Sequence, residues 1–522
     1  MLFYILLTIV TLAYLWIRRR YFYWKRRSVP YVEPSFPLGN LWGMNKRHFG
    51  LLGQDVYMKL KETGSKLGGM FFFVNPVAVI LDLDFAKDVF VKDFQYFHDR
   101  GEYSNEKVDP IMAHLVTMEG TKWKNLRTKL TPVFTSGKMK MMFPTIVTVA
   151  EEFWKCMVEE AGKGEDIEMK EFLARFTTDV IGNCAFGLEC NSLKDPEAEF
   201  RKMGRKAMAM SPMEFLRRRL CNSFRGLAKV LGMRLSDPDV ADFFMNAVRS
   251  TIEYRERNGI HRNDFMDLLI KMRNPESIDG SSDEMGMLTF NEIAAQAFVF
   301  FLAGFETSST AMSFCLYELA KNQELQNKAR RNIADVLAKH GAMTYEAVHE
   351  MAYIENCING IQLLDFIDDI TDFYLDFYFT ESLRKYPPVT NIVRSVTKSY
   401  RVPGMNVTLE KDCRILLPVY AIHHDPQLFP HPEQYDPDRF NADQSAGRHP
   451  MAFVPFGEGP RICIGLRFGM MQARIGLTCL LKHFRFTLSD RMHDPLMMKS
   501  NTIILASEGG LWMKLECLED KL

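Results

Sequence analysis

The sequence lacks any C-x-x-C pair, although it contains ten cysteines in 522 residues. Its histidines form no zinc-like grouping with these cysteines. This spacing argues against a structural metal site and against a small secreted domain held together by disulfides. We therefore expect reduced cysteines in a reducing compartment.

The sequence also lacks an excess of charge of either sign, because 65 Lys+Arg balance 65 Asp+Glu. This balance argues against a protein that binds nucleic acid through general electrostatics. Internal repeats and low-complexity tracts are absent as well. A hydrophobic content of 47% is ordinary for a globular chain and predicts a large core. The 40 Phe and 32 Met indicate either ordinary core packing or an adaptable apolar pocket.

The N-terminus begins with the unbroken apolar run LFYILLTIVTLAYLWI, followed by the basic groups RRR and KRR. As a helix this run spans ~24 Å, just short of the ~30 Å hydrocarbon core of a bilayer. The run predicts an uncleaved transmembrane anchor over residues 1–20, and the basic residues predict a cytosolic body. A cleavable signal peptide is the alternative, but no basic segment precedes the run and no small-residue cleavage site follows it.

The rest of the chain predicts a fold that is mainly α with a smaller β portion. Residues 21–39 are basic and proline-rich and predict a stiff hinge. Residues 40–522 then predict one large catalytic domain, with β-like runs near 69–81, helical periodicity from about 83 to 360, and turns after Pro387. A helix is expected from Leu466 to His483, and a last strand over residues 501–505.

One cysteine stands in a distinctive local sequence. Residues 456–465 read FGEGPRICIG, which places Cys463 among glycines and directly before the expected helix. Glycines allow tight turns that bring backbone N–H groups close to one sulfur. The positive end of the helix and Arg461 would lower the pKa of the thiol. A thiolate in such a loop suits a nucleophile or an iron ligand, and local chemistry favours neither.

The pattern F-x-x-G-x-R-x-C-x-G resembles the haem-binding loop of the cytochrome P-450 enzymes, and the similarity extends over nearly the whole chain. Residues 303–307 (AGFET) lie in an apolar helix expected from Asn291 to about Leu319 and resemble the oxygen-activating centre of the family. Further matches are E-x-x-R at 381–384, PDRF at 437–440 and W-x-x-x-R at 123–127. Residues 134–138 and 301–307 are similar to insect members related to vertebrate drug-metabolising enzymes.

The resemblance implies haem b as the cofactor, with Cys463 as the axial thiolate that pushes electron density onto the iron. Phe456 of the same loop is also implied to contact the cofactor. The side chains implied to satisfy the two haem propionates, which would otherwise be buried without compensation, are Trp123, Arg127, Arg394, Arg461 and Arg100. A buried structural network is implied for Glu381, Arg384 and Arg439.

Two readings remain for Glu306 and Thr307. In the first, Thr307 bonds back to a helix carbonyl and Glu306 reaches solvent. In the second, which the resemblance implies, the helix breaks locally at Gly304 and opens a groove for water. Thr307 and Glu306 would then relay protons to bound dioxygen. We expect the second reading.

The chain has no evident site for nicotinamide or flavin. Its nearest candidate, residues 457–462, lacks the third glycine of G-x-G-x-x-G and a βαβ setting. The resemblance therefore implies an external NADPH-cytochrome P-450 reductase, with cytochrome b5 as a further candidate donor. The lysines that either dock this partner or form an ordinary solvated face are Lys124, Lys129, Lys138 and Lys140. The implied location is the endoplasmic reticulum membrane.

Residues 360–380 (GIQLLDFIDDITDFYLDFYFT) depart from the family, whose members run directly from a segment like 351–359 into E-S-L-R. The aspartates of this stretch alternate with apolar residues at neither a helical nor a strand period. As added helix it would extend ~31 Å, which a packed core cannot absorb. We hypothesise a translated, unspliced intron, because the codons at both ends permit GT and AG borders. A lineage-specific loop is the alternative.

These observations predict a membrane-anchored haem-thiolate monooxygenase. It would insert one oxygen atom from O2 into lipophilic small molecules, either xenobiotics such as plant toxins or insecticides, or endogenous lipophiles. The variable walls of its pocket would lie at residues 103–119 and 208–215, which are rich in Met and Phe. Two alternatives are a haem-thiolate isomerase or dehydratase that needs no reductase, and an inactive, haem-poor product of the 360–380 insert.

Overall fold

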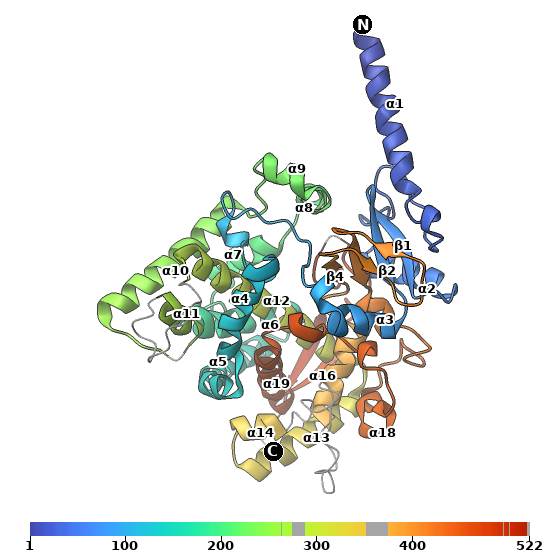
Figure 1. The fold of residues 1–522 in the computed structure, drawn as a ribbon. Helices are drawn as coiled ribbons and strands as arrows, with labels where there is room; N and C mark the ends of the chain where they lie inside the picture. Colours follow the sequence, from blue (N-terminus) through green and yellow to red (C-terminus); the bar gives the residue numbers. More distant parts are fainter. Residues whose placement is uncertain (263, 274–287, 351–373, 494, 501, 519–522) are drawn as a thin grey trace.

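A computed structural model describes residues 1–262, 264–273, 288–350, 374–493, 495–500 and 502–518 of the chain. Helices form most of this part and short strands form less of it, which confirms the predicted class. In Figure 1 most helices lie on one side of the molecule, and the main sheet lies with α2 and α3 on the other. The helices of the body are α2 Phe49–Lys61, α3 Leu83–Lys87, α4 Gly120–Leu130, α5 Ser136–Gly162, α6 Met169–Ile181, α7 Glu199–Met208, α8 Pro212–Ser223, α9 Arg225–Val230, α10 Pro238–Asn258, α11 Phe265–Arg273, α12 Phe290–Lys321, α13 Gln323–His340, α14 Tyr345–Glu350, α16 Tyr374–Lys385, α17 Val419–His423, α18 Ala442–Ser445 and α19 Leu466–His483.

Helix α12 runs through the large helical core and is apolar on nearly all sides. A capping box starts it: the Thr289 hydroxyl accepts the Glu292 N–H, and the Glu292 carboxylate accepts the Thr289 N–H. Gly304 allows α6 to pack closely, since a Cβ at this position would lie 2.3 Å from Ile181 Cδ1. The helix is therefore held against α6 at the very residues where the sequence placed the functional motif.

A four-stranded sheet forms a second core together with α2 and α3. Its order is β1-β2-β7-β4; β1 pairs antiparallel with β2, β2 parallel with β7, and β7 antiparallel with β4. A three-stranded sheet has the order β3-β9-β8, and a two-stranded one pairs β5 with β6. The strands are β1 Leu67–Phe72, β2 Asn75–Ile80, β3 Ile167–Glu168, β4 Ile392–Ser395, β5 Tyr400–Arg401, β6 Thr408–Leu409, β7 Arg414–Leu417, β8 Phe484–Leu488 and β9 Trp512–Cys517.

The end of the chain differs from the prediction. The last strand is β9, which pairs with β8, whereas residues 502–505 are irregular. Ile504 and Leu505 are buried without strand pairing, at 8% and 0% exposed, whereas Ile503 is 43% exposed. The Leu505 N–H donates to the Pro388 carbonyl at 3.0 Å. This apolar run is therefore an irregular segment with two buried residues. Periodicity over five residues does not distinguish such a segment from a strand.

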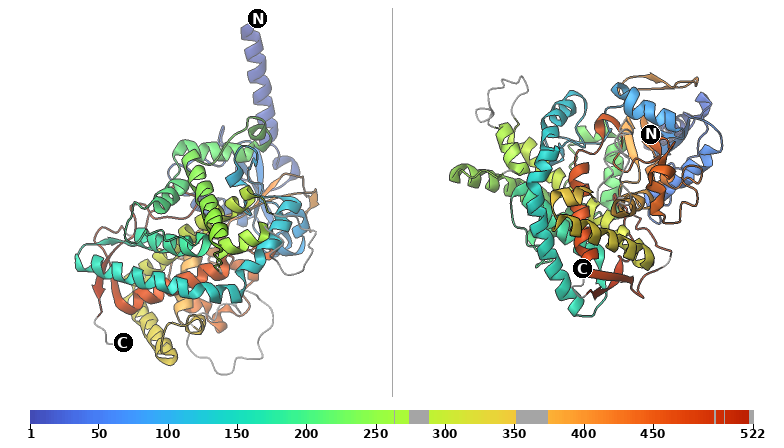
Figure 2. Two further views of the ribbon diagram at one scale, coloured as in Figure 1. Left: turned by 90° about the vertical axis from the view of Figure 1, so that its left-hand side faces the viewer. Right: turned by 90° about the horizontal axis from the view of Figure 1, so that it is seen from below.

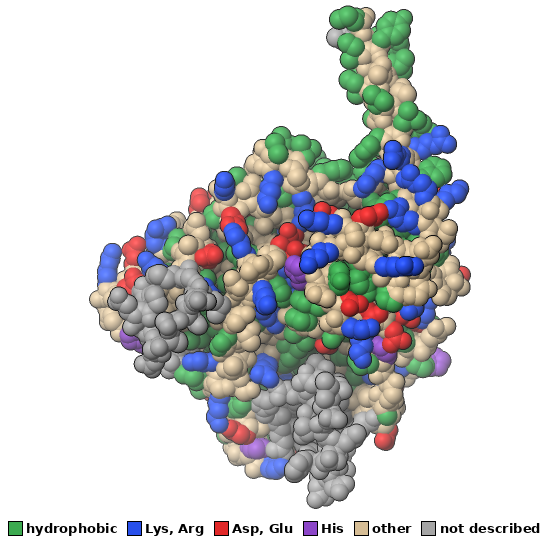
Figure 3. Space-filling view, viewed as in Figure 1, with side chains coloured by type: hydrophobic (Ala, Val, Ile, Leu, Met, Phe, Trp, Pro, Cys, Tyr) green, Lys and Arg blue, Asp and Glu red, His purple; other side chains and the backbone are tan. Residues whose placement is uncertain are grey.

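Helix α1, Leu2–Tyr21, projects from the body as an isolated helix (Figures 1 and 2). Its apolar side chains are exposed, and Lys and Arg gather at its base (Figure 3). Among the described residues, α12 alone is long and apolar enough to cross a membrane by length and composition, and 67% of that stretch is buried. Burial of that kind is typical of the core helix of a soluble domain.

The predicted hinge packs on the sheet. Trp24 is 0% exposed, and its indole Nε1 donates to the Met70 carbonyl at 3.1 Å. A Cβ on Gly69 would lie 2.4 Å from the Trp24 ring, so glycine is needed there. Arg27 and Tyr23 both contact the Glu410 carboxylate. Residues 23–27 therefore belong to the body, whereas the apolar part of α1 projects from it; at the end of this helix Arg20 donates to the Val74 carbonyl.

Candidate functional site

The loop before α19 folds tightly around Cys463. Gly457 and Gly459 have φ of 75° and 72°, in the left-handed region that favours glycine. A Cβ on Gly459 would lie 1.9 Å from the Phe90 carbonyl oxygen, so no other residue fits. The Cys463 N–H donates to the Phe456 carbonyl at 2.9 Å, which closes the loop. The spacing of the motif thus fixes where the sulfur lies, directly before the first turn of α19.

The Cys463 side chain is free and exposed. The surrounding chain nevertheless desolvates the thiol and raises its pKa, while the Gly465 N–H and the charges of Arg127 and Arg100 act in the opposite direction. The Cys463 residue is thus accessible to solvent although protein surrounds the thiol, which indicates a recessed position. The sequence predicted a lowered pKa; burial outweighs the positive groups. Metal coordination would deprotonate such a thiol outright.

Four arginines meet beside this cysteine, as the sequence predicted: Arg100, Arg127, Arg394 and Arg461. Arg394 and Arg461 are 1% and 2% exposed. Burial lowers the pKa of each arginine, and the nearby guanidinium groups lower it further for Arg127, Arg394 and Arg461, in the last case to about 9. Like charges gathered in this way need an anion to compensate them.

The arginines also present unused hydrogen-bond donors. Among the described residues, the Nε atoms of Arg100, Arg394 and Arg461 and the Nη1 of Arg461 are buried without a partner. Each unsatisfied buried donor costs about 1–3 kcal/mol. Trp123 of α4 lies under Arg461, whose guanidinium carbon is 4.1 Å from the ring centroid. Donors of this number and charge fit a ligand with two carboxylates, such as the propionates of haem b.

The middle of α12 faces the same kind of open space. Ala303 is exposed although most of the helix is buried, and Thr307 is partly exposed. The Thr307 hydroxyl donates to the Ala303 carbonyl at 2.6 Å, as the first of the two readings expected. The helix does not break at Gly304, contrary to the second reading. Gly304 faces α6, and its carbonyl accepts the Gln472 side-chain amide at 2.9 Å.

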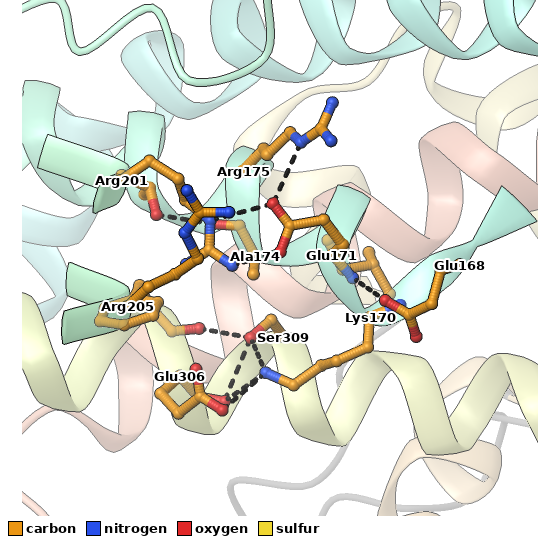
Figure 4. A network of polar contacts seen from close by, with 12 residues as sticks. Glu168, Lys170, Glu171, Ala174, Arg175, Arg201, Arg205, Glu306 and Ser309 are labelled. Atoms are coloured by element: carbon orange, nitrogen blue, oxygen red, sulfur yellow. Dashed lines mark hydrogen bonds and ion pairs between the residues drawn. The ribbon is translucent and has the colours of Figure 1, made fainter. Parts of the chain in front are cut away.

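Glu306 is ion-paired, which neither reading anticipated. Lys170 of α6 lies 2.9 Å from the Glu306 carboxylate and donates to the Ser309 hydroxyl at 2.7 Å (Figure 4). Beside this pair, Glu171 binds Arg201 at 2.6 Å. Glu306 is thereby held on the α6 side of α12. A proton relay through its carboxylate would require that it leave Lys170.

The predicted structural network is present and fully buried. The Arg384 guanidinium grips the Glu381 carboxylate with two hydrogen bonds of 2.7 Å, and both residues are 0% exposed. Arg439 approaches the same carboxylate at 3.4 Å. Arg384 also donates to the carbonyls of His423 and Pro432. The ion pair thus lies within α16, and the Arg384 donations join this helix to the end of α17 and to the chain after it.

The sequence did not single out Lys170, Ser309 or Asp99, each of which contacts a predicted site residue. Lys170 and Glu306 are 136 positions apart, so no local pattern connects them. Asp99 lies 3.9 Å from Arg461 and accepts the Gly120 N–H at 2.7 Å. Its position directly before Arg100 was the only signal that could have found it.

The hypothesised insert at 360–380 lies largely outside the described residues. Its residues 374–380 are described and form the first part of α16, which continues directly into Glu381. Phe379 and Thr380 are 3% and 4% exposed, so this end of the stretch joins the core. The intron hypothesis itself stays a prediction.

A recessed, solvent-accessible cysteine beside four arginines, three of which have buried donors without a partner, is the arrangement expected of a haem-thiolate protein. The family model "Cytochrome P-450" matches residues 33–363 and 367–513 of the chain. Probable cytochrome P-450 6a14 of Drosophila melanogaster is 42% identical over 520 residues, covering 97% of this chain and 98% of that protein. Cytochrome P-450 6A1 of Musca domestica is 40% identical over 528 residues, covering 100% of this chain and 99% of that protein. The chain belongs to the cytochrome P-450 family, and it is a monooxygenase with a thiolate-ligated haem iron.

Proposed function

We propose that this chain is a microsomal monooxygenase that inserts one oxygen atom from O2 into lipophilic small molecules. Electrons would come from NADPH through a separate reductase, with cytochrome b5 as a further candidate donor. The observation that carries the proposal is the group of buried, unpaired arginine donors beside the Cys463 thiol. The insect relatives support a protein of the same general kind.

The residues that would hold the haem come from distant parts of the chain. Cys463 Sγ would ligate the iron, and the Gly465 N–H would orient the sulfur. Arg100, Arg127, Arg394 and Arg461 would bind the propionates, and Phe456 would close the loop behind the sulfur. When bound, the haem supplies the oxygen-activating chemistry, and the protein supplies binding, orientation and exclusion of water.

Thr307 and Glu306 are the proposed proton-handling groups. The Thr307 hydroxyl lies at the open part of α12, where it donates to the Ala303 carbonyl. Glu306 is its neighbour in sequence and is held by Lys170. We infer that the Glu306 carboxylate can exchange protons on the Thr307 side of α12 only when its contact with Lys170 breaks.

The proposed membrane attachment and the proposed docking site of the electron donor rest on features of the protein surface. The apolar, exposed α1 with basic residues at its base supports an anchor in the endoplasmic reticulum membrane and a body on the cytosolic side. Lys124, Lys138 and Lys140 lie on α4 and α5, and α4 also carries Trp123 and Arg127 of the cofactor site. This proximity supports reductase docking on that face. Lys129 on α4 is a further candidate.

The test is the reduced, carbon-monoxide-bound absorption spectrum, followed by NADPH consumption in membranes with added reductase. The wild type should show the band of a thiolate-ligated haem, and Cys463→Ser should lose it. The matched control is Cys517→Ser, because Cys517 is also free and exposed but lies on β9. We expect NADPH consumption that requires both reductase and O2. The proposal would be refuted if the wild type lacked the band, or if turnover did not depend on added reductase.

A further inference from the structure

Asp99 lies between the start of α4 and the cysteine loop. Its Oδ1 accepts the Gly120 N–H at 2.7 Å and lies 3.9 Å from Arg461 Nη2. The same oxygen is 3.6 Å from the His98 ring. The Asp99 carbonyl accepts the Ser395 N–H at 2.7 Å, so its backbone is tied to β4. One carboxylate therefore contacts two elements that carry cofactor residues.

The first of these elements is α4. Gly120 is its first residue, and the preceding Glu119 makes no side-chain cap. Glu119 instead contacts Arg225. Asp99 thus supplies from outside the hydrogen-bond acceptor and the negative charge that a helix N-terminus favours. Because α4 carries Trp123 and Arg127, the contact with Asp99 fixes where both side chains lie.

The second element is the loop with Arg461. Arg461 Nη2 donates to the Met118 carbonyl at 2.7 Å and faces Asp99 on the same nitrogen. The guanidinium plane is held over Trp123. With Nη2 occupied, Nε and Nη1 are the buried donors left for a ligand. Asp99 therefore helps to orient the Arg461 guanidinium so that Nε and Nη1 are left for a ligand.

Charge gives the same residue a second effect. Four arginines and the two propionates of haem b leave a positive excess, and Asp99 is a carboxylate 16% exposed at the edge of this cluster. We propose that Asp99 is a positioning residue for the haem propionate site: it caps α4, orients Arg461, and tunes the electrostatic potential at the haem. The inference rests on the proposed placement of haem beside Cys463.

The experiment compares Asp99→Asn and Asp99→Ala in the full-length holoprotein. Asparagine keeps the oxygen that accepts the Gly120 N–H but removes the charge. Its haem should have a more positive reduction potential, because loss of a nearby negative charge favours the state with one more electron. Alanine also removes the cap. We expect roughly fivefold faster haem transfer to excess apomyoglobin, the equivalent of one lost hydrogen bond.

The matched control is Asp93→Asn, which removes the same charge six positions away. The Asp93 carboxylate accepts the Tyr400 hydroxyl of β5 at 2.7 Å. The control should change neither the potential nor the transfer rate. If the haem of Asp99→Asn has the same reduction potential as the haem of the control, the inference is overturned. A lower melting temperature of Asp99→Ala would not rescue it, because loss of the cap alone explains that result. A wild type without a thiolate-ligated spectrum would overturn the proposed function as well, so the two failures are distinguishable.

Discussion

Lys170 Nζ lies 2.9 Å from Glu306 Oε1, so a lysine at the start of α6 holds the carboxylate that we propose for proton transfer. Both side chains are about one-fifth exposed, at 20% and 19%. Solvent screening keeps the pair's contribution to stability small, about 1 kcal/mol or less. The ion pair matters more for the orientation of the Glu306 side chain, because Lys170 is itself held in place by the Ser309 hydroxyl.

Lys170→Met should free Glu306, and Glu306→Gln should remove the carboxylate. If Glu306 supplies protons from the Lys170 side of α12, the solvent kinetic isotope effect on product formation should fall in the first variant and rise in the second. The control is Lys163→Met, because Lys163 forms an exposed pair with Glu160 away from α12. Shifts in the same direction for Lys170→Met and Glu306→Gln would show that the ion pair has another role.

The Glu381–Arg384 pair should be essential for a folded holoprotein. Both side chains are 0% exposed, and removal of one partner of such a pair costs about 3–5 kcal/mol because the other charge stays buried. Glu381→Gln should therefore abolish the thiolate-ligated spectrum through loss of folded protein. Arg384→Lys should not rescue it, since an ammonium cannot reproduce the two parallel hydrogen bonds. Holoprotein yield and circular dichroism provide the measurement.

A matched control for this pair is Lys155→Ala, which breaks the exposed contact with Glu152. Its holoprotein yield should stay within a factor of about two of wild type, because solvent and salt screen an exposed pair and leave it little effect on stability. Normal yield from Glu381→Gln would contradict the structural role and would reopen a catalytic one.

Gly459→Ala should prevent haem incorporation. The added Cβ would meet the Phe90 carbonyl oxygen at 1.9 Å, and the φ of 72° is itself unfavourable for alanine. The backbone around Cys463 would have to shift, so we expect loss of the thiolate-ligated band with little change in helix content. Gly162→Ala is the control, since nothing lies within 4 Å of a Cβ there. An unchanged spectrum in Gly459→Ala would mean that this loop tolerates displacement.

The sequence predicted best what depends on local spacing. The bounds of α19 were predicted at Leu466 and His483, and the E-x-x-R spacing placed Glu381 and Arg384 on one helix, where they pair. The gathering of the four arginines came from the family resemblance and not from local spacing. Contacts between distant segments could not be predicted. The partner of Glu306 lies 136 positions away, and Asp99 acts on a helix 21 positions later. The predicted break at Gly304 failed because a helix glycine can equally serve close packing against a neighbour, here Ile181.

The intron hypothesis for residues 360–380 is tested outside the protein. If it is right, the genomic sequence has GT within the codon for Gly360 and AG just before the second base of the Glu381 codon. A shorter transcript should then join the codon of Asn359 to that of Glu381. Absence of either border, or of the shorter transcript, would leave a lineage-specific loop as the explanation.

The boundary between α1, which is the proposed anchor, and the body can be located by truncation. Removal of residues 2–19 should release the protein from membranes and keep the reduced, carbon-monoxide-bound spectrum, because the apolar part of α1 is exposed and Arg20, which contacts the body, is kept. Trp24→Ala in the same shortened chain should cost about 3–5 kcal/mol, since Trp24 is 0% exposed and donates to the Met70 carbonyl. Thermal unfolding of the two proteins measures this difference. Replacement of the exposed Trp42, which is 52% exposed, is the control and should cost far less. Equal melting of all three would mean that residues 23–27 do not pack on the body, contrary to the structure.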